Sequence, residues 1–192
     1  ARVRGYPSTS SLHLRLRVAG WTFGLLLIAA LANAQINPAS RAAREWRQQH
    51  ERQIVDEFIT LLRVPNIASD TANIARNAEM LAKMLAARGV AAKLVSVPGG
   101  NPVVVGELRT TGATRTIGFY AHYDGQPLDP KEWATPPFEP VLRDRPIESG
   151  GKAIPLPTPG AALDPESRLY ARSAGDDKAA IIAMLAALDA VR

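Results

Sequence analysis

The sequence contains no cysteine and only three histidines among its 192 residues. Without cysteine the chain forms no disulfide bond and offers no thiolate to a metal ion, so a metal site would need histidine and carboxylate ligands. The absence of cysteine is compatible with an oxidising compartment but does not establish one. Because histidines are few, each can be weighed singly as a ligand: His13, His50 and His122.

A basic stripe is also lacking, although the formal net charge is +5 and the pI is about 9.9. Residues 1–34 contain no acidic residue and four arginines, namely Arg2, Arg4, Arg15 and Arg17. Subtracting these four from the 23 lysines and arginines leaves 19 basic against 18 acidic residues in the rest of the chain. Such a nearly neutral body has no electrostatic footprint for nucleic acid, which is excluded as a partner.

No apolar run is long enough for a typical membrane-spanning helix, which needs roughly 20 residues. The run at residues 18–32 follows a basic flank and ends in Ala32-Asn33-Ala34. This layout predicts a signal peptide over residues 1–34, cleaved after Ala34, and therefore export, with the periplasm as the expected compartment. The alternative is an uncleaved N-terminal anchor. After cleavage, we expect no stable membrane insertion.

Hydrophobic periodicity predicts three helices and three strands. The helices are residues 42–63, 71–88 and the closing stretch from 176, and the strands are residues 91–97, 103–108 and 116–124. Ser69 or Asp70 can cap the second helix, and Gly89 ends it. This order predicts an α/β fold in which helices flank a mixed, mostly parallel sheet.

The third predicted strand ends on His122 and Asp124. Side chains two residues apart share one face of a strand, and ligands bind at the carboxyl ends of strands in open α/β sheets. A metal-bound imidazole usually donates its second N–H to a carboxylate, for which Asp124 is well placed. The alternative is a core histidine whose hydrogen bond to a turn aspartate is purely structural.

Asp176, Asp177 and Lys178 open the last predicted helix. One aspartate would suffice as an N-cap, and acidic residues suit the positive end of a helix. Two adjacent carboxylates indicate a bound cation or a strained turn instead. Lys178 is interpreted as a solvated partner of one of them.

Three segments together resemble a known family: His122-Tyr123-Asp124, then Trp133 with PPF at 136–138, then LYARSAGDDK at 169–178. The family is the co-catalytic zinc metallopeptidases that include aminoacylase, glutamate carboxypeptidase, succinyl-diaminopimelate desuccinylase and carnosine dipeptidase. Its usual motifs are His-x-Asp at a strand end and Tyr-Gly-Arg-Gly-x-x-Asp-x-Lys-Gly before a helix. The resemblance covers residues 41–192, and the double aspartate favours the dipeptidase branch.

The resemblance implies a role for each site residue. His122 and Asp176 resemble metal ligands, and Asp176 is the carboxylate that bridges two divalent ions, expected to be Zn²⁺. Asp124 resembles the catalytic carboxylate that orients His122. The family's peptide bond after the bridging aspartate is cis, so a cis bond is expected between Asp176 and Asp177. Trp133 is expected, like Phe138, to pack its loop without touching substrate.

The implied reaction is metal-dependent hydrolysis of an amide or peptide bond in a small peptide or N-acyl amino acid. The first interpretation is an exported dipeptidase or carboxypeptidase. If the protein is another kind of enzyme, the alternative is an N-acyl-amino-acid deacylase. If it is not an enzyme, the alternative is a non-catalytic exported binding or assembly module of the same fold. The resemblance also implies a homodimer formed through a lid domain.

The family's general-base glutamate, its remaining ligands and its lid have no counterpart before Arg192. Residues 35–192 therefore resemble the N-terminal part of a truncated catalytic domain, and we expect this chain alone to be inactive. Ala171 and Ser173 replace glycines of the family motif, where positive backbone angles would be disfavoured; this departure supports the non-catalytic alternative. Residues 143–168 are longer than the family's hairpin, and we interpret them as an elaboration near the cleft, with a plain surface excursion as the alternative.

Overall fold

The computed structural model describes residues 37–191, with the exception of Val97. The chain divides into two units, Ala1–Ala42 and Ala43–Arg192. The predicted signal peptide lies outside the described residues. No helix within residues 37–96 or 98–191 combines the length and the apolar character needed to cross a membrane.

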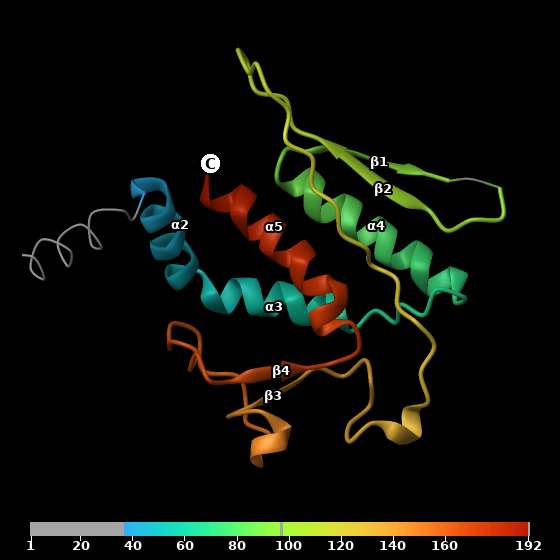
Figure 1. The fold of residues 1–192 in the computed structure, drawn as a ribbon, viewed down its shortest axis with the longest axis vertical. Coiled ribbons are helices and arrows are strands. Elements are labelled where there is room, and N and C mark those ends of the chain that lie inside the picture. The colour runs from blue at the N-terminus through green and yellow to red at the C-terminus, as the bar shows by residue number, and fades with distance from the viewer. Residues whose placement is uncertain (1–36, 97, 192) are drawn as a thin grey trace, which may run out of the picture. The chain divides into compact units, whose positions relative to one another are not determined.

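The described elements are helices joined to two small hairpins (Figure 1). In chain order they are α2 (Pro38–Gln49), α3 (Glu51–Leu62), α4 (Thr71–Ala87), β1 (Ala91–Val95), β2 (Val103–Glu107), the short helical turn η1 (Pro130–Glu132), β3 (Val141–Arg143), the turn η2 (Ile147–Ser149), β4 (Arg168–Tyr170), the turn η3 (Ala174–Lys178) and α5 (Ala179–Ala190).

Residues 42–63, predicted as one helix, belong to two helices that meet at His50. This residue has φ −114° and ψ 11°, outside the helical region. Its ring stacks on Trp46, with 4.1 Å between the ring centroids. Its backbone N–H is shared between the carbonyls of Trp46 and Arg47. Such a tightened last turn satisfies terminal carbonyls and ends α2.

Both ends of α4 follow the sequence prediction. Asp70 is the N-cap, because its Oδ1 accepts the Asn73 backbone N–H at 3.1 Å and its Oδ2 accepts the Asn73 side-chain amide at 2.6 Å. At the other end, Gly89 takes φ 69° directly after the C-cap Arg88. Glycine adopts this left-handed conformation without a Cβ penalty, which makes it a natural helix stop.

We expect Asp70→Ala to destabilise the fold at neutral pH and to matter less in acid. Hydrogen bonds from Asn73 hold the pKa of Asp70 below its ordinary value of 3.8. A carboxylate whose pKa is lower in the folded state stabilises that state above its unfolded pKa, and the contribution is lost as the pH falls through the folded pKa. The difference in urea midpoint between wild type and variant should therefore be constant above about pH 5 and shrink below pH 3.8.

The control for this prediction is Glu79→Ala, which removes an exposed carboxylate from the middle of α4. It should change the urea midpoint little at either pH. A difference between wild type and Asp70→Ala that is the same at pH 3 and pH 7 would show that the charge on the cap has no part in stability.

The described strands form two separate two-stranded antiparallel sheets, so the predicted mostly parallel sheet is not confirmed. β1 pairs with β2 in a register that places Leu94 opposite Val104, and β3 pairs with β4. Among the described residues outside these strands, parallel pairing is limited to a bridge between Ile67 and Gly125. The α/β class is confirmed at the coarser level of helices combined with small sheets.

The predicted strand at residues 116–124 is wrong as a paired element. Ile117, Phe119 and Tyr120 are 77%, 74% and 87% exposed. An extended segment becomes a strand only when a neighbour supplies partners for its N–H and C=O groups. None of the four described strands pairs with these residues, since β1 and β2 are each other's partners.

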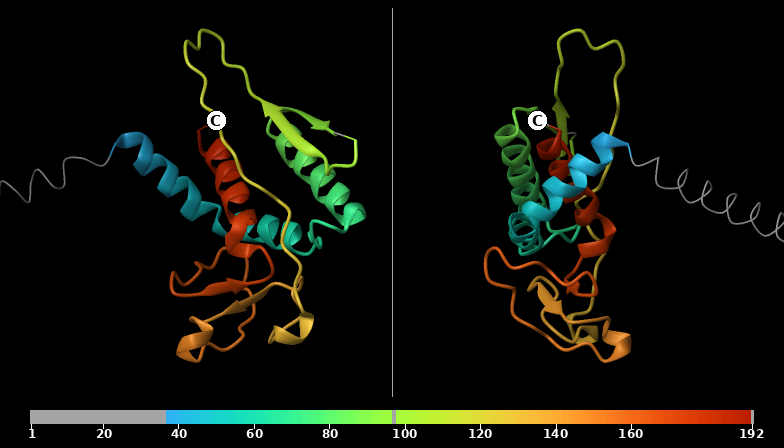
Figure 2. Two further views of the ribbon diagram at one scale, coloured as in Figure 1. Left: turned by 45° about the vertical axis from the view of Figure 1, so that its right-hand side comes forward. Right: turned by 90° about the vertical axis from the view of Figure 1, so that its left-hand side faces the viewer.

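The core of the second unit lies between α3, α4 and α5 (Figures 1 and 2). Its buried members are Leu61, Leu81, Ile181, Ile182 and Leu185. Met80 and Met84 of α4 pack against this cluster, as do Ala121 and Tyr123. The residues on either side of His122 are thus anchored in the core, which fixes where that histidine lies.

Residues 143–168 pack against the first turn of α3 instead of forming an elaboration of the site. The Leu163 N–H donates to Glu51 Oε2 at 3.4 Å, and the Arg52 guanidinium donates to the Pro157 carbonyl. This segment is therefore better described as a surface excursion that is hydrogen-bonded to α3 than as an elaboration near the cleft.

Candidate functional site

His122 lies at the end of the extended segment and faces acceptors on both sides of its ring. Its Nε2 lies 2.8 Å from Asp176 Oδ1, and its Nδ1 lies 3.0 Å from the backbone carbonyl oxygen of Asp124. Its backbone N–H donates to Asp177 Oδ2 at 3.3 Å. The side chain keeps 38% of its surface exposed. The ring is therefore held in one orientation at an accessible position.

Asp124 contacts the ring through its carboxylate and its backbone, and the backbone makes the shorter contact. Its carboxylate Oδ1 is 3.3 Å from His122 Nδ1, against 3.0 Å for its own carbonyl oxygen. Orientation of the ring comes first from the carbonyl and second from the carboxylate. A buried core histidine paired with a turn aspartate does not describe this geometry, because the ring is partly exposed and also faces Asp176.

The Asp176–Asp177 pair sits in an irregular turn and does not cap a helix. Ser173 precedes it in the left-handed region at φ 61°. Asp176 has φ −125° and ψ 97°, and the Asp176–Asp177 peptide bond is cis, as the family resemblance implies. Neither η3 nor α5 has a side-chain N-cap, so the capping interpretation is wrong. The Asp176 side chain is 91% exposed and directed at His122.

Ser173 shows how the chain accommodates its departure from the family motif. Positive φ is expected to disfavour a residue with a Cβ, yet Ser173 is buried in this conformation. Its Oγ accepts a hydrogen bond from Asn66 Nδ2 at 2.9 Å. The hydroxyl thus supplies a contact that glycine could not make at this position.

A pocket of about 220 Å³ opens beside these residues. It is lined by His122, Asp124, Gly125, Gln126, Arg172 and Asp176. Arg172 forms its cationic wall, with Nη2 donating to the Gln126 carbonyl at 2.9 Å and Nε buried without a hydrogen-bond partner. No lining residue comes from residues 143–168, and neither Trp133 nor Phe138 lines the pocket.

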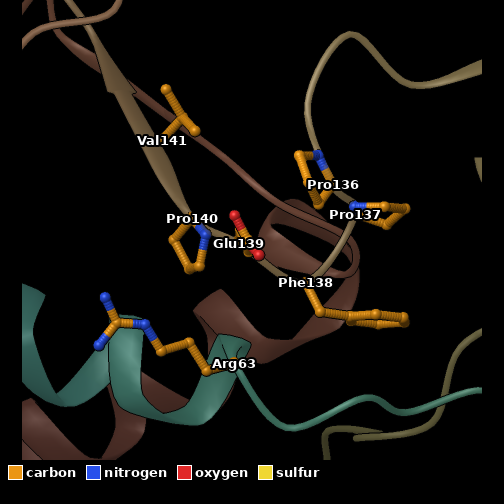
Figure 3. Close-up of a pocket in the computed structure, with 7 residues that line it drawn as sticks. All are labelled: Arg63, Pro136, Pro137, Phe138, Glu139, Pro140 and Val141. Carbon is orange, nitrogen blue, oxygen red and sulfur yellow. The ribbon is translucent and has the colours of Figure 1, made fainter.

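A larger cavity of about 620 Å³ lies elsewhere in the second unit, at the end of α3 (Figure 3). It is lined by Arg63 and residues 136–141, including Phe138, and shares no residue with the His122 pocket. Arg63 and Glu139 are its charged side chains. Its position gives it no part in the candidate site.

The charge state of His122 is biased toward the imidazolium. The hydrogen bond to the Asp176 carboxylate raises the pKa of His122 above 6.5, although partial burial opposes the shift. The Asp124 carbonyl and the negative charges of both carboxylates also raise this pKa. With a proton on each nitrogen, the ring satisfies both acceptors at once. Metal binding at Nε2 would displace one proton and leave Nδ1–H donating to Asp124.

Lys178 is not a solvated partner of the aspartates, which corrects the sequence interpretation. Its side chain is fully buried. Nζ donates to the carbonyl oxygens of Leu61 and Val64 at 2.9 Å each. These carbonyls lie at the C-terminal end of α3, where the helix dipole favours a cation. Burial lowers the pKa of Lys178 from 10.5 to about 7.

His122 and Asp176 provide the nitrogen and oxygen donors that zinc takes in proteins. Tetrahedral zinc with bonds of about 2.0–2.1 Å separates two ligand atoms by about 3.3 Å, so the pair would open by about 0.5 Å from its observed 2.8 Å. Within the described part of the chain, no group of three or more His, Asp or Glu side chains could hold a metal ion. The residues present fit two ligands of such a site, short of the three protein ligands of a catalytic zinc.

Comparison with known proteins gives a likeness in fold. No protein-family model matches the chain, and no curated protein matches it. Among solved structures, that of the dipeptidase Dug1p from Saccharomyces cerevisiae matches this chain with a TM-score of 0.60 and 19% sequence identity. The chain is similar in fold to Dug1p. The match covers 78% of this chain and 30% of the Dug1p chain.

The candidate site also contains residues that the sequence did not indicate. The sequence indicates Asn66 only as part of the Val-Pro-Asn stretch that ends a helix, yet this residue is fully buried and contacts both site segments. Gln126 and Arg172 line the pocket without an assigned role. The sequence feature that could have indicated Asn66 is an asparagine next to a proline at a helix end. Because this pattern occurs in many turns, it does not single out a site residue.

Proposed function

We propose that this chain forms part of the active site of an exported, zinc-dependent dipeptidase or carboxypeptidase. The observation that carries the proposal is the 2.8 Å approach of His122 Nε2 to Asp176 Oδ1, two residues 54 positions apart in the chain. The likeness in fold to the dipeptidase Dug1p supports the same assignment. Cleavage of the signal peptide after Ala34 and release to the periplasm belong to the proposal.

In this proposal, His122 through Nε2 and Asp176 through its carboxylate would be ligands of two divalent ions. Asp124 would accept a hydrogen bond from Nδ1–H, which leaves the Nε2 lone pair free for the metal. Bound divalent ions polarise the scissile carbonyl and lower the pKa of a bound water. A carboxylate as exposed as Asp176 can take up either metal without breaking a buried interaction.

The substrate follows from the size and charge of the pocket. A volume of about 220 Å³ is small for a ligand site and suits a dipeptide or an N-acyl amino acid. Arg172 adds a positive charge to the lining, which also contains the carboxylates of Asp124 and Asp176. The proposal further requires a general-base glutamate and more metal ligands, because His122 and Asp176 supply two of the three protein ligands that a catalytic zinc takes, and it includes a homodimer formed through a lid domain.

Metal analysis of the full-length protein tests the proposal. We expect two zinc ions per chain, hydrolysis of dipeptides, loss of hydrolysis on removal of zinc with a chelator, and recovery when zinc is returned. Active enzyme without zinc would contradict the metal assignment. A clear preference for N-acyl amino acids over dipeptides would identify a deacylase, and zinc-loaded protein without any hydrolysis would favour a binding module.

A further inference from the structure

Asn66 lies just beyond α3, in a short segment that passes between the two parts of the candidate site. It is fully buried, with 0% of its surface exposed. A buried amide is expected to have its hydrogen-bonding groups paired, and the identity of its partners reveals what it holds. Asn66 has partners in both site segments, residues 122–125 and residues 173–177.

The first segment is attached to Asn66 by side chain and backbone. Nδ2 of Asn66 donates to the carbonyl oxygen of Tyr123 at 2.8 Å, directly after His122. The backbone carbonyl of Asn66 accepts the Gly125 N–H at 2.7 Å, directly after Asp124. Each of the two residues of the first ligand motif, His122 and Asp124, is therefore followed directly by a residue that hydrogen-bonds to Asn66.

The second segment is attached through Ser173. The same Nδ2 donates to Ser173 Oγ at 2.9 Å. Ser173 lies three residues before Asp176, and its carbonyl accepts the Lys178 N–H at 3.1 Å, which closes the turn that carries Asp176. A primary amide nitrogen has two N–H groups, so Asn66 can serve both segments from one atom, which a hydroxyl or a carboxylate cannot do.

The two segments approach each other closely at this junction. A Cβ on Gly125 would lie 2.9 Å from Ser173 Oγ and 3.3 Å from Asn66 Nδ2. The first distance is shorter than real side chains tolerate, so the two segments touch where Asn66 joins them. Any loss of the amide would allow them to separate along this contact.

We infer that Asn66 is a positioning residue that holds the His122 segment against the Asp176 turn and so sets the distance between the two metal ligands. As a metal-site role, the inference rests on the proposed function. Residues that orient metal ligands typically change metal affinity by about 10- to 100-fold when mutated. The joining of the two segments is a separate property of the chain and can be measured without metal.

The test compares Asn66→Ala with Asn77→Ala in the full-length protein. Asn77 is a matched control, because it is equally buried and its Nδ2 also makes two hydrogen bonds, to the Pro65 and Asn73 carbonyls at 2.8 Å each. Amide hydrogen exchange of the metal-free protein is measured at His122, Gly125 and Lys178. Zinc affinity and the urea unfolding midpoint are measured alongside.

In Asn66→Ala we expect exchange at these amides to rise by roughly two- to tenfold, the effect of losing a typical hydrogen bond. The zinc dissociation constant should rise by about 10- to 100-fold. In Asn77→Ala the unfolding midpoint falls, while exchange at these amides and zinc affinity stay near wild type. Equal exchange and equal zinc affinity in the two variants would overturn the inference, because Asn66 would then be only another buried amide.

Ser173→Gly provides a second variant if Asn66→Ala does not fold. Glycine accepts φ 61° without strain, and the substitution removes the CH2OH side chain whose oxygen receives the Asn66 hydrogen bond. Faster exchange at Lys178 in this variant supports the inference, and unchanged exchange contradicts it.

If wild type binds no zinc and Asn66→Ala still loosens both segments, the proposed function fails while the joining role of Asn66 stands. If zinc-dependent hydrolysis survives Asn66→Ala unchanged, the proposed function stands and the positioning role fails.

Discussion

His122→Ala in the full-length protein is expected to abolish hydrolysis and weaken zinc binding while leaving the fold intact. The substitution removes the nitrogen donor that faces Asp176 at 2.8 Å. Metal ions contribute several kcal/mol of transition-state stabilisation, and each 1.36 kcal/mol is a factor of ten in rate. Loss of a ligand should therefore lower kcat/KM by about a thousandfold or more.

The fold should survive because His122 lies outside the core. Its side chain is 38% exposed, and its hydrogen-bond partners are the backbone of Asp124 and the carboxylate of Asp176. Ala121 and Tyr123 make the core contacts on either side and are untouched by the change. Circular dichroism and the urea midpoint should thus stay close to those of the wild type.

His50→Ala is the matched control, since it removes the other histidine that the structure describes. His50 stacks on Trp46 at the junction of α2 and α3 and lines neither cavity. Its variant should retain zinc and full turnover. Near-normal turnover in His122→Ala, with zinc still bound, would show that the role of this histidine is structural.

The parts of the fold that the sequence predicted well are those decided by neighbours in the chain. The limits of α4 follow from the Asp70 cap and the Gly89 stop, both local interactions within a few residues. The β1–β2 hairpin likewise follows from two short apolar runs around a Pro-Gly-Gly turn. Local signals of this kind need no knowledge of what lies across the molecule.

Predictions failed where the outcome depends on distant partners. The stretch at 116–124 has the composition of a buried strand, but strand formation requires a paired neighbour, which periodicity does not reveal. Lys178 looked solvated because a single sequence cannot show that its side-chain nitrogen donates to the carbonyls of Leu61 and Val64, which lie 117 and 114 residues away. The same limit hid Asn66, whose partner Ser173 lies 107 residues away.

The candidate site was partly predictable because its chemistry lies in two short motifs. His122, Asp124 and Asp176 do lie together around one pocket. The relative contribution of the Asp124 backbone and carboxylate could not be predicted, because it depends on distances that differ by 0.3 Å. Sequence motifs therefore indicated which groups meet, and packing determined how they meet.

Lys178→Ala is expected to be the most destabilising change near the site. The ammonium is the donor to the carbonyls of Leu61 and Val64, and its side chain fills a fully buried space. Truncation leaves buried acceptors without this partner and opens a cavity beside α3. Large-to-small substitutions of this kind cost about 2–5 kcal/mol of unfolding free energy.

Lys178→Met separates the contribution of the hydrogen bonds from that of the volume. Replacing a buried ion together with its partners by apolar groups is often neutral, but here the two backbone carbonyls remain. We therefore expect the methionine variant to lose about 1–3 kcal/mol, less than the alanine variant. Lys83→Ala, at an exposed position of α4, should stay within about 0.5 kcal/mol of wild type.

Urea midpoints should thus fall in the order wild type, Lys178→Met, Lys178→Ala, with Lys83→Ala beside the wild type. A methionine variant as stable as wild type would mean that the cost of burying the ammonium cancels its two hydrogen bonds. Because Lys178 follows Asp176 by two residues and ties the turn to α3, the same variants should also raise exchange at the Ala174 amide, which donates to the Ala171 carbonyl in that turn. A loss of stability without faster exchange at Ala174 would show that Lys178 stabilises the core but does not hold the turn that carries Asp176.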